Sequence, residues 1–258
     1  MSASFDTAAA AYDSTFTHSI IGKLQRKYVY RHFLKVLDGK QLNILEINCG
    51  TGEDAIWLAK NGHFVTATDI SEKMIAAAKH KNFAQNIHFE VTDINKITDF
   101  GNEKFDLVFS NFGGLNCLSK PEFGQFFKNI STVLNEKGKL VLVIMPKNTL
   151  WEQFYFLMKG NFKKIFRRKK TLNIANVDGE NVPTYYHNPK ETVTLAAQHF
   201  EILTKYPIGF FIPPSYLEPF LKNRKWLSNF LDWFENTVTN FGFLSKYADH
   251  YCIVFQKR

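Results

Sequence analysis

The stretch Glu46-Ile47-Asn48-Cys49-Gly50-Thr51-Gly52 decides the fold, because it joins an apolar run to a helical pattern through a turn with two glycines. Residues 44–47 predict a buried strand, and residues 54–60 carry the pattern of a helix. Gly50 and Gly52 have no side chain, so the backbone of the turn can approach a ligand closely. Asn48 stands where a third glycine would be expected, and asparagine tolerates left-handed backbone better than most residues. The stretch therefore predicts a strand, a ligand-binding turn and a helix in succession.

The alternation of apolar strand and amphipathic helix continues to residue 146. Further strands are predicted at residues 64–68, 87–91, 105–110 and 139–145. Helices are predicted after the cap Ser71 and over residues 122–134. Continuous apolar strands that alternate with amphipathic helices indicate a mostly parallel sheet covered on both faces. The predicted fold class is therefore α/β with a doubly wound sheet.

After Pro146 the alternation stops. Residues 151–158 are helix-like and aromatic, and residues 171–177 and 182–187 predict a hairpin joined through Asp178-Gly179. A helix is predicted over residues 192–200, and further strands over residues 200–205 and 251–256. Between these two strands a helix carries aromatic and apolar side chains at four-residue spacing, which we interpret as core packing: Trp226, Phe230, Phe234 and Val238.

The size and the cysteine content bound the class of protein. A chain of 258 residues with 45% hydrophobic residues can bury a sizeable core without disulfide or metal staples. Cys49, Cys117 and Cys252 form no CxxC pair, which excludes a zinc finger and favours a reducing compartment. The N-terminus lacks the pattern of a signal peptide, and the longest apolar run, residues 140–145, is too short to span a membrane. We therefore expect a cytoplasmic location.

The net charge of +8 is local. Residues 159–170 contain seven cations and no acid, so the rest of the chain carries a net charge of only +1. A nucleic-acid-binding protein usually spreads its cations over a whole face, so nucleic acid is not the partner we predict. The segment 159–170 instead predicts a local contact with an anionic membrane.

Two aspartates end neighbouring predicted strands. Asp69 follows the second strand, 17 residues beyond Gly52, and Asp93 follows the third strand with Ile94 behind it. A doubly wound sheet binds its ligand at the carboxyl ends of its strands. A carboxylate at Asp69 can accept both hydroxyls of a ribose, and Asp93 with Ile94 suits the amino group and the face of an adenine. The two aspartates therefore predict a nucleoside site.

These motifs resemble the class I S-adenosylmethionine-dependent methyltransferases. Residues 46–52 resemble the family's acidic-x-Gly-x-Gly-x-Gly motif, from which Asn48 departs at the first glycine. Residues 65–71 resemble the ribose-binding strand end, and residues 105–111 resemble the fourth strand. Phe5-Asp6 and Tyr12-Asp13 resemble the N-terminal segment that closes over the cofactor in small-molecule members. The resemblance covers residues 1–146 and extends to the closing strands.

The resemblance implies a seven-stranded sheet with strand order 3-2-1-4-5-7-6, in which strand 7 is antiparallel. It also implies one methyltransferase domain over residues 1–258, with a cap inserted between strands 5 and 6. Within it we expect cofactor-covering helices at 1–39, a cofactor-binding core at 40–146, an acceptor cap at 147–190 and closing elements at 191–258.

The resemblance also implies the cofactor, S-adenosylmethionine, and its product S-adenosylhomocysteine, with no metal. Glu46 would order the turn and approach the methionine ammonium group, and the backbone of Asn48, Cys49, Gly50 and Gly52 would lie against methionine and ribose. Asp69 would bind the ribose hydroxyls. The adenine and the sulfonium would then lie beside the remaining implied residues: Ile70, Met74, Asp93 and Ile94 for the adenine, Asn111 and Phe112 for the sulfonium, and Tyr12 in the covering segment.

Methyl transfer is an in-line displacement, for which a protein supplies alignment, desolvation and sometimes a base. The candidate catalytic residues are His187, Tyr185 and His18. Side chains alternate along a strand, so Tyr185 and His187 would share one face of the predicted hairpin. That face either points into the cleft or packs against the C-terminal region.

Other chemistries fit the sequence less well. A nicotinamide enzyme needs GxGxxG, and the last glycine is absent after Gly52. Residues 110–115 lack the Asn/Asp-Pro-Pro-Tyr motif of amino-group methylation, Cys117 lacks the setting of a cytosine C5 nucleophile, and no residue spacing resembles a metal cage.

The sequence thus predicts a methyltransferase that acts on oxygen or nitrogen of a small, aromatic or otherwise apolar acceptor. Three alternatives remain open. The first is an RNA- or ribosome-directed methyltransferase that uses residues 159–170, and the second is a membrane-peripheral enzyme that methylates a lipid or quinone. The third is a protein that binds the cofactor without acceptor chemistry.

Overall fold

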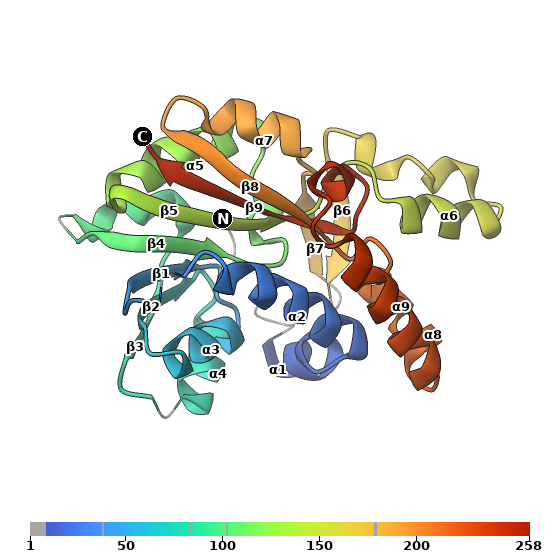
Figure 1. The fold of residues 1–258 in the computed structure, drawn as a ribbon, viewed down its shortest axis with the longest axis horizontal. Coiled ribbons are helices and arrows are strands. Elements are labelled where there is room, and N and C mark those ends of the chain that lie inside the picture. The colour runs from blue at the N-terminus through green and yellow to red at the C-terminus, as the bar shows by residue number, and fades with distance from the viewer. Residues whose placement is uncertain (1–8, 38, 83, 102, 178–179) are drawn as a thin grey trace.

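Strand β1 (Asn43–Ile47) lies at the centre of the sheet, parallel to β2 (Phe64–Asp69) and β4 (Phe105–Ser110) on either side. On the far side of β2 lies the parallel strand β3 (Ile87–Val91), and β5 (Leu134–Ile144) runs parallel to β4. Figure 1 shows this computed structural model, which describes residues 9–37, 39–82, 84–101, 103–177 and 180–258.

The sheet ends in two further strands, of which only β9 (His250–Lys257) runs antiparallel to the others. Strand β9 pairs antiparallel with β5, and β8 (Phe200–Ile208) pairs antiparallel with β9. The strand order is therefore β3-β2-β1-β4-β5-β9-β8. This order confirms the predicted 3-2-1-4-5-7-6, with β8 and β9 in the places of strands 6 and 7. The chain has the Rossmann-like α/β fold that the sequence predicted.

Helices cover both faces of the sheet, and the alternation along β1 fixes which residues meet them. Ile44 faces α2 (Ile20–Leu34), α3 (Glu53–Lys60) and α4 (Glu72–Lys81) in one buried cluster. Leu45 faces the opposite cluster, which contains α5 (Lys120–Val133) and α7 (Pro189–Ala196). Because successive side chains point to opposite faces, one short strand contributes to both cores.

The remaining elements are short or belong to the insertion after β5. At the N-terminus and between the first strands lie α1 (Ala9–Tyr12), η1 (Asp13–Thr17), η2 (Ile94–Phe100) and η3 (Gly114–Cys117). The insertion contains α6 (Leu150–Met158), η4 (Phe162–Lys164), η5 (Arg167–Lys169), β6 (Asn173–Val177) and β7 (Glu180–Thr184). Between β8 and β9 lie η6 (Ser215–Leu217), α8 (Glu218–Leu221), α9 (Lys225–Val238) and η7 (Gly242–Lys246).

The predicted hairpin and the predicted helix cap are confirmed. Strands β6 and β7 pair antiparallel, from Asn173 opposite Thr184 to Val177 opposite Glu180. Asp178 and Gly179, which were predicted to form the turn, lie outside the described residues. Ser71 caps α4, because its hydroxyl oxygen accepts a hydrogen bond from the backbone N–H of Met74 at 3.1 Å.

The interpretation of the α9 stripe as core packing was wrong for Trp226 and Phe230, whereas Phe234 and Val238 are half-buried. Trp226 is 70% exposed and Phe230 is 51% exposed, whereas Glu235 of the same helix is fully buried. The Glu235 carboxylate accepts hydrogen bonds from the four backbone N–H groups of residues 209–212, at 2.7 to 3.2 Å. A buried carboxylate with four donors fixes which face of the helix turns inward. Trp226 and Phe230 consequently turn outward.

Two of the seven cations of residues 159–170 are structural. Arg167 forms a bidentate ion pair with the buried Glu152 at 2.7 and 2.8 Å. Arg168 is itself buried and bonds both Glu152, at 3.0 Å, and Asp249, at 2.9 Å. The five lysines of the segment remain exposed: Lys159, Lys163, Lys164, Lys169 and Lys170. None of the described helices has the length and apolar character that crossing a membrane requires.

Candidate functional site

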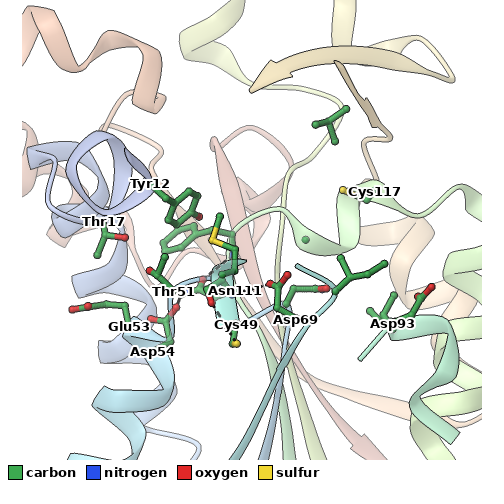
Figure 2. A pocket seen from close by; sticks show the side chains of 18 of the residues that line it. Tyr12, Thr17, Cys49, Thr51, Glu53, Asp54, Asp69, Asp93, Asn111 and Cys117 are labelled. Atoms are coloured by element: carbon green, nitrogen blue, oxygen red, sulfur yellow. Dashed lines mark hydrogen bonds between the residues drawn. The ribbon is translucent and has the colours of Figure 1, made fainter. Parts of the chain in front are cut away.

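A cavity of about 380 Å³ opens at the carboxyl ends of the parallel strands (Figure 2). Its walls come from the turn after β1, the ends of β2 and β4, the residues after β3, the N-terminal segment and strand β7. Most of the residues predicted to bind the cofactor line it: Tyr12, Asn48, Cys49, Gly50, Asp69, Ile70, Met74, Asp93, Ile94, Asn111 and Phe112. The topology therefore brings together residues that are up to 100 positions apart in the sequence.

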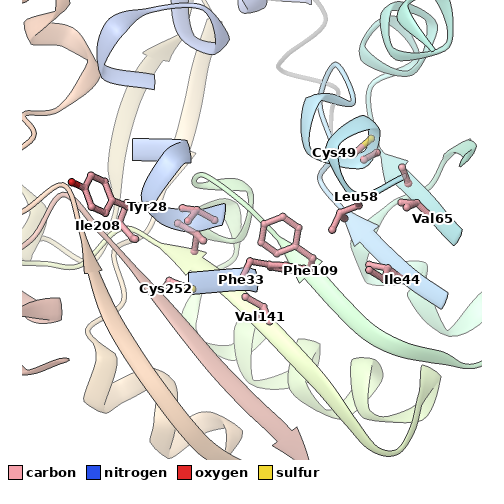
Figure 3. Close-up of a cluster of buried hydrophobic side chains, with 14 of the residues drawn as sticks. Tyr28, Phe33, Ile44, Cys49, Leu58, Val65, Phe109, Val141, Ile208 and Cys252 are labelled. Atoms are coloured by element: carbon pink, nitrogen blue, oxygen red, sulfur yellow. The ribbon is translucent and has the colours of Figure 1, made fainter. Parts of the chain in front are cut away.

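The turn after β1 adopts left-handed backbone at three positions. The φ angles are 57° at Asn48, 54° at Gly50 and 77° at Gly52, so asparagine does take the conformation that a glycine would take there. Below the turn, Cys49 packs on the core with Ile44 and Val65 (Figure 3). This core holds the turn in place at the floor of the cavity.

Gly52 does not line the cavity, and its role is to let neighbouring elements pack closely. A Cβ atom at Gly52 would lie 2.8 Å from the ring of Phe89 and 2.9 Å from the Cβ atom of Ala78. These distances are too short for a side chain. Gly52 thus lets the start of α3 lie close to β3 and α4.

Asp69 and Asp93 both line the cavity and both hold local backbone. The Asp69 carboxylate accepts hydrogen bonds from the backbone N–H groups of Gly50 and Ser71, each at 2.9 Å. Asp93 accepts from the backbone N–H of Asn95 at 2.9 Å and from its side-chain amide at 3.0 Å. A carboxylate has about four lone-pair positions, so each of these two can accept several hydrogen bonds. Their roles toward ribose and adenine remain predictions.

The N-terminal segment is fastened to the glycine turn through Asp13. The Asp13 carboxylate accepts a hydrogen bond from the Thr51 hydroxyl at 2.6 Å and forms an ion pair with Lys81 at 2.8 Å. Partial burial raises the pKa of Asp13, but the bonds from Lys81 and Thr51 outweigh it and the pKa is lowered. Burial raises the pKa of the neighbouring Tyr12 to about 12, so that phenol stays neutral. Phe5 and Asp6 of the predicted segment lie outside the described residues.

Replacing Asp13 by Asn is expected to loosen this segment. Loss of the ion pair should cost about 1 kcal/mol and raise the rate of amide hydrogen exchange over residues 9–19 about fivefold. Because the pKa of Asp13 is lowered in the folded state, the contribution is present at neutral pH and is lost as the pH falls through that lowered value. Hydrogen exchange with mass spectrometry measures the effect. The exposed Asp99, changed to Asn, is the control, and equal exchange in both variants would contradict the expectation.

The sequence did not predict a buried network of charged residues at the cavity wall. Arg26 of α2 bonds the Asp54 carboxylate through Nε at 2.9 Å, and Asp54 also accepts bonds from the Tyr30 hydroxyl at 2.7 Å and the Asn111 side-chain amide at 3.0 Å. The guanidinium lies 5.2 Å from the centre of the Phe112 ring. Burial lowers the pKa of Arg26, but Asp54 outweighs it, so the pKa is raised and the guanidinium stays charged.

One buried guanidinium nitrogen of Arg26 lacks a hydrogen-bond partner in the described part of the chain. Arg26 lines the cavity and is only 8% exposed, and its Nη1 atom has no hydrogen-bond partner among the described residues. A buried charged donor without a partner is costly. No local sequence motif indicates this network, because Arg26 and Asp54 lie 28 positions apart and meet only through the packing of α2 against α3.

Glu46 lies beneath the turn and is not part of the cavity lining. It is 1% exposed, and its Oε2 atom has no hydrogen-bond partner among the described residues. Burial, together with the nearby Asp54, raises its pKa well above the usual range. The predicted contact between Glu46 and a methionine ammonium group remains a prediction.

Of the three candidate catalytic residues, the structure brings only Tyr185 to the cavity, where it lies with Val182 and Pro183. His18 is exposed and does not line the cavity. His187 is buried, donates from Nε2 to the carbonyl oxygen of Leu118 at 3.0 Å, and packs 4.5 Å from the Phe123 ring. The alternation that placed Tyr185 and His187 on one face ends because β7 stops at Thr184.

Replacing His187 by Ala is expected to lower the free energy of unfolding by roughly 3 kcal/mol, because it leaves a cavity and an unpaired buried carbonyl group. Burial lowers the pKa of His187 below its usual 6.5, so the neutral side chain stabilises the fold above that pH and loses its contribution as the pH falls below it. The difference between the two proteins should therefore shrink from pH 8 to pH 5 in denaturant titrations. Unchanged stability with lost methyl transfer would instead make His187 the base.

Known proteins that are similar to this chain are methyltransferases. The family model described as "Methyltransferase domain" matches residues 44–138. A malonyl-[acyl-carrier protein] O-methyltransferase of Bacillus anthracis is 30% identical over 183 residues, which are 67% of this chain and 59% of the relative. A demethylmenaquinone methyltransferase of Leptospira interrogans is 33% identical over 135 residues, 48% of this chain and 53% of the relative. The chain thus spans only part of the length of these relatives.

Solved structures share the fold. The magnesium protoporphyrin IX methyltransferase of Synechocystis, with bound SAH, superposes with a TM-score of 0.59 at 16% identity, covering 93% of this chain and 86% of that one. An S-adenosylmethionine-dependent methyltransferase of Mesorhizobium loti superposes with a TM-score of 0.56 at 16% identity, covering 89% and 97%. In the described residues, no group of three or more histidine, cysteine or acidic side chains is placed to hold a metal ion. The matching domain, the strand order and the strand-end motifs together identify residues 44–138 as a methyltransferase domain.

Proposed function

We propose that this protein transfers the methyl group of S-adenosylmethionine to an oxygen or nitrogen atom of a small, aromatic or otherwise apolar acceptor. The observation that carries the proposal is the convergence of the glycine turn, Asp69, Asp93 and the unpartnered Arg26 nitrogen on one cavity. The division into covering helices at 1–39, core at 40–146, acceptor cap at 147–190 and closing elements at 191–258 is part of the proposal.

The residues at the cavity fit the chemical groups of this cofactor. Asp69 would bind the ribose hydroxyls, and Asp93 with Ile94 and Ile70 would hold the adenine. Nη1 of Arg26 is a buried cationic donor without a partner, which suits the methionine carboxylate. Gly114 lets η3 pack closely against the turn after β1, because a Cβ atom there would lie 2.5 Å from the Cβ atom of Asn48.

When bound, the cofactor supplies a methyl group activated by a positively charged sulfur. The protein's own part is to align and desolvate the reactants. Tyr12, Thr51 and Asp13 hold the N-terminal segment over the cavity and keep water out. Phe112, whose φ of 41° places its ring under Arg26, forms an apolar wall. Alignment without an obligatory histidine base is therefore the mechanism that we propose.

The acceptor would lie under strand β7. Val182, Pro183 and Tyr185 line the cavity from β7 and the residue after it, and Cys117 lies opposite on η3. Apart from the Tyr185 hydroxyl and the Cys117 thiol, these side chains offer only apolar surface. The relatives are named for malonyl-[acyl-carrier protein] and demethylmenaquinone, and we take from these names only that a small-molecule acceptor is compatible with the fold.

Calorimetry with S-adenosylmethionine and S-adenosylhomocysteine on the full chain is the first test, and we expect micromolar-class affinity for both. The second test incubates the protein with methyl-labelled cofactor and panels of phenols, quinols, carboxylates and amines, and measures labelled product. Transfer to one apolar class is the expected result. Absence of binding would contradict the proposal, and binding without transfer to any panel would favour the non-enzymatic alternative.

A further inference from the structure

Helix α6 turns its apolar side outward. Phe154, Leu157 and Met158, which lie three and four positions apart on one helix face, are 57%, 51% and 71% exposed. The single charged residue of the helix, Glu152, is buried between Arg167 and Arg168. This is the reverse of the usual surface helix, which turns its charges to water. Nothing within the described residues covers the apolar stripe.

Helix α9 has the same reversal. Trp226, Phe230 and Trp233 follow one another at four- and three-residue spacing, and all three are more than half exposed. Its buried acid, Glu235, is bound by the backbone of residues 209–212, so the helix cannot rotate without losing four hydrogen bonds. The outward orientation of the aromatic stripe is therefore fixed by the fold.

The two helices lie at one end of the molecule (Figure 1). Tyr155 of α6 contacts the ring of Tyr216, which precedes α8, at 5.7 Å. Trp151 donates a hydrogen bond to the carbonyl oxygen of Phe211 at 2.9 Å, and the Phe211 ring in turn contacts Phe234 of α9 at 5.2 Å. These contacts connect α6 to α9. We call the exposed side chains of the two helices the aromatic end: Phe154, Leu157, Met158, Trp226, Phe230 and Trp233.

Cations border the aromatic end on both helices. The five exposed lysines of residues 159–170 follow α6, and Lys222, Arg224 and Lys225 lie at the start of α9. The sequence contains no acid between residues 153 and 177 or between residues 219 and 231. The apolar surface is thus bordered by positive charge that no neighbouring acid in these segments neutralises.

We propose that the aromatic end binds the surface of an anionic lipid bilayer. Tryptophan and phenylalanine enter the boundary between headgroups and acyl chains, and bordering lysines contact the lipid phosphates. Apolar area of this kind with bordering cations distinguishes an interaction surface from isolated exposed side chains. The inference is independent of the proposed methyl transfer.

The charge pattern argues against two other occupants. A second copy of the chain would place like-charged borders against each other, which is repulsive. A single-stranded nucleic acid would use the aromatic rings for stacking but would leave aliphatic side chains such as Leu157 and Met158 against charged backbone. An anionic bilayer satisfies the apolar centre and the cationic border at once.

Co-sedimentation of the full chain with vesicles tests the proposal. Vesicles of phosphatidylcholine with 30 mol% phosphatidylglycerol should bind the protein at least tenfold more tightly than vesicles of phosphatidylcholine alone, and salt should weaken the binding. The variant W226S/F230S/W233S should bind at least tenfold more weakly. Because all three side chains are exposed, its melting temperature should stay close to that of the parent protein.

Matched controls separate the site from general effects. Phe64 on β2 is 51% exposed, so F64S removes a similar aromatic side chain away from the aromatic end and should bind like the parent. K163E/K164E should lose binding, whereas K60E/K128E, with the same change in net charge, should retain it. The tryptophan emission should shift to shorter wavelength with anionic vesicles, and W226F/W233F should lose most of this shift while still binding.

Three results would overturn the proposal. They are no sedimentation with anionic vesicles, equal loss of binding in the control variants, and a triple serine variant that changes only the oligomeric state in light scattering. If the first result were accompanied by RNA binding, RNA would replace the bilayer as the occupant. None of these measurements involves methyl transfer, so a negative outcome would leave the proposed enzymatic function unaffected.

Discussion

Replacing Asp69 by Ala is expected to weaken the binding of S-adenosylmethionine by about 100-fold or more. The proposed carboxylate contacts to two ribose hydroxyls are charge-assisted hydrogen bonds, each worth about 1.5–3 kcal/mol, and 1.4 kcal/mol corresponds to a tenfold change in affinity. Asp69 also accepts hydrogen bonds from the backbone N–H groups of Gly50 and Ser71, so the substitution loosens the turn as well. Calorimetry measures the loss of affinity.

A control and a modified ligand separate these two contributions. Asp106 also accepts a backbone N–H at 2.9 Å, from Asn43, but it lies at the amino end of the parallel strands. Asp106→Ala should therefore leave cofactor affinity unchanged. An S-adenosylhomocysteine analogue without ribose hydroxyls should bind the parent protein weakly. It should bind the Asp69 variant with the same weak affinity, because the analogue already lacks the hydroxyl groups that Asp69 would contact. Equal discrimination by both proteins would remove Asp69 from the ribose site.

The fold could be predicted because its signals are local. The continuous apolar run in β5 and the strand-end positions of Asp69 and Asp93 each follow from a few neighbouring residues. Left-handed backbone at Asn48 follows from the tolerance of asparagine for this conformation at a position where a glycine would be expected. Parallel strands necessarily bring their carboxyl ends to one edge, so the topology turns these separate local signals into one cavity.

The parts that could not be predicted depend on pairing between distant residues. The spacing in α9 predicts a stripe but not which way it faces, because the partners of Glu235 are the backbone groups of residues 209–212. The net charge of residues 159–170 says nothing of Arg168 being buried against Asp249, 81 positions away. The alternation rule failed at His187 because it requires a strand, and the strand ends three residues earlier.

The second prediction with a large expected effect concerns Arg26. Replacing Arg26 by Gln should lower the free energy of unfolding by about 3–5 kcal/mol, because it leaves the buried Asp54 carboxylate without its cation. It should also weaken the binding of S-adenosylmethionine by at least tenfold, because the proposed partner of the methionine carboxylate is lost. Denaturant titration measures the first effect and calorimetry the second. Arg26→Lys keeps the charge but loses the planar fork, and we expect intermediate values for both quantities.

The decarboxylated form of S-adenosylmethionine tests the assignment even if both variants are less stable. The parent should prefer the carboxylated cofactor, and Arg26→Gln should bind both forms with nearly equal affinity, since the group that discriminates between them is gone. Lys27→Gln is the matched control: it removes a cation from the same helix, but one that pairs with Asp232 at the surface and lies outside the cavity lining. It should keep the parent's preference and lose less than about 1 kcal/mol of stability. If Arg26→Gln keeps the full preference for the carboxylated cofactor, the free Nη1 atom serves another group, and the acceptor becomes its next candidate, because Arg26 and Phe112 share one wall of the cavity.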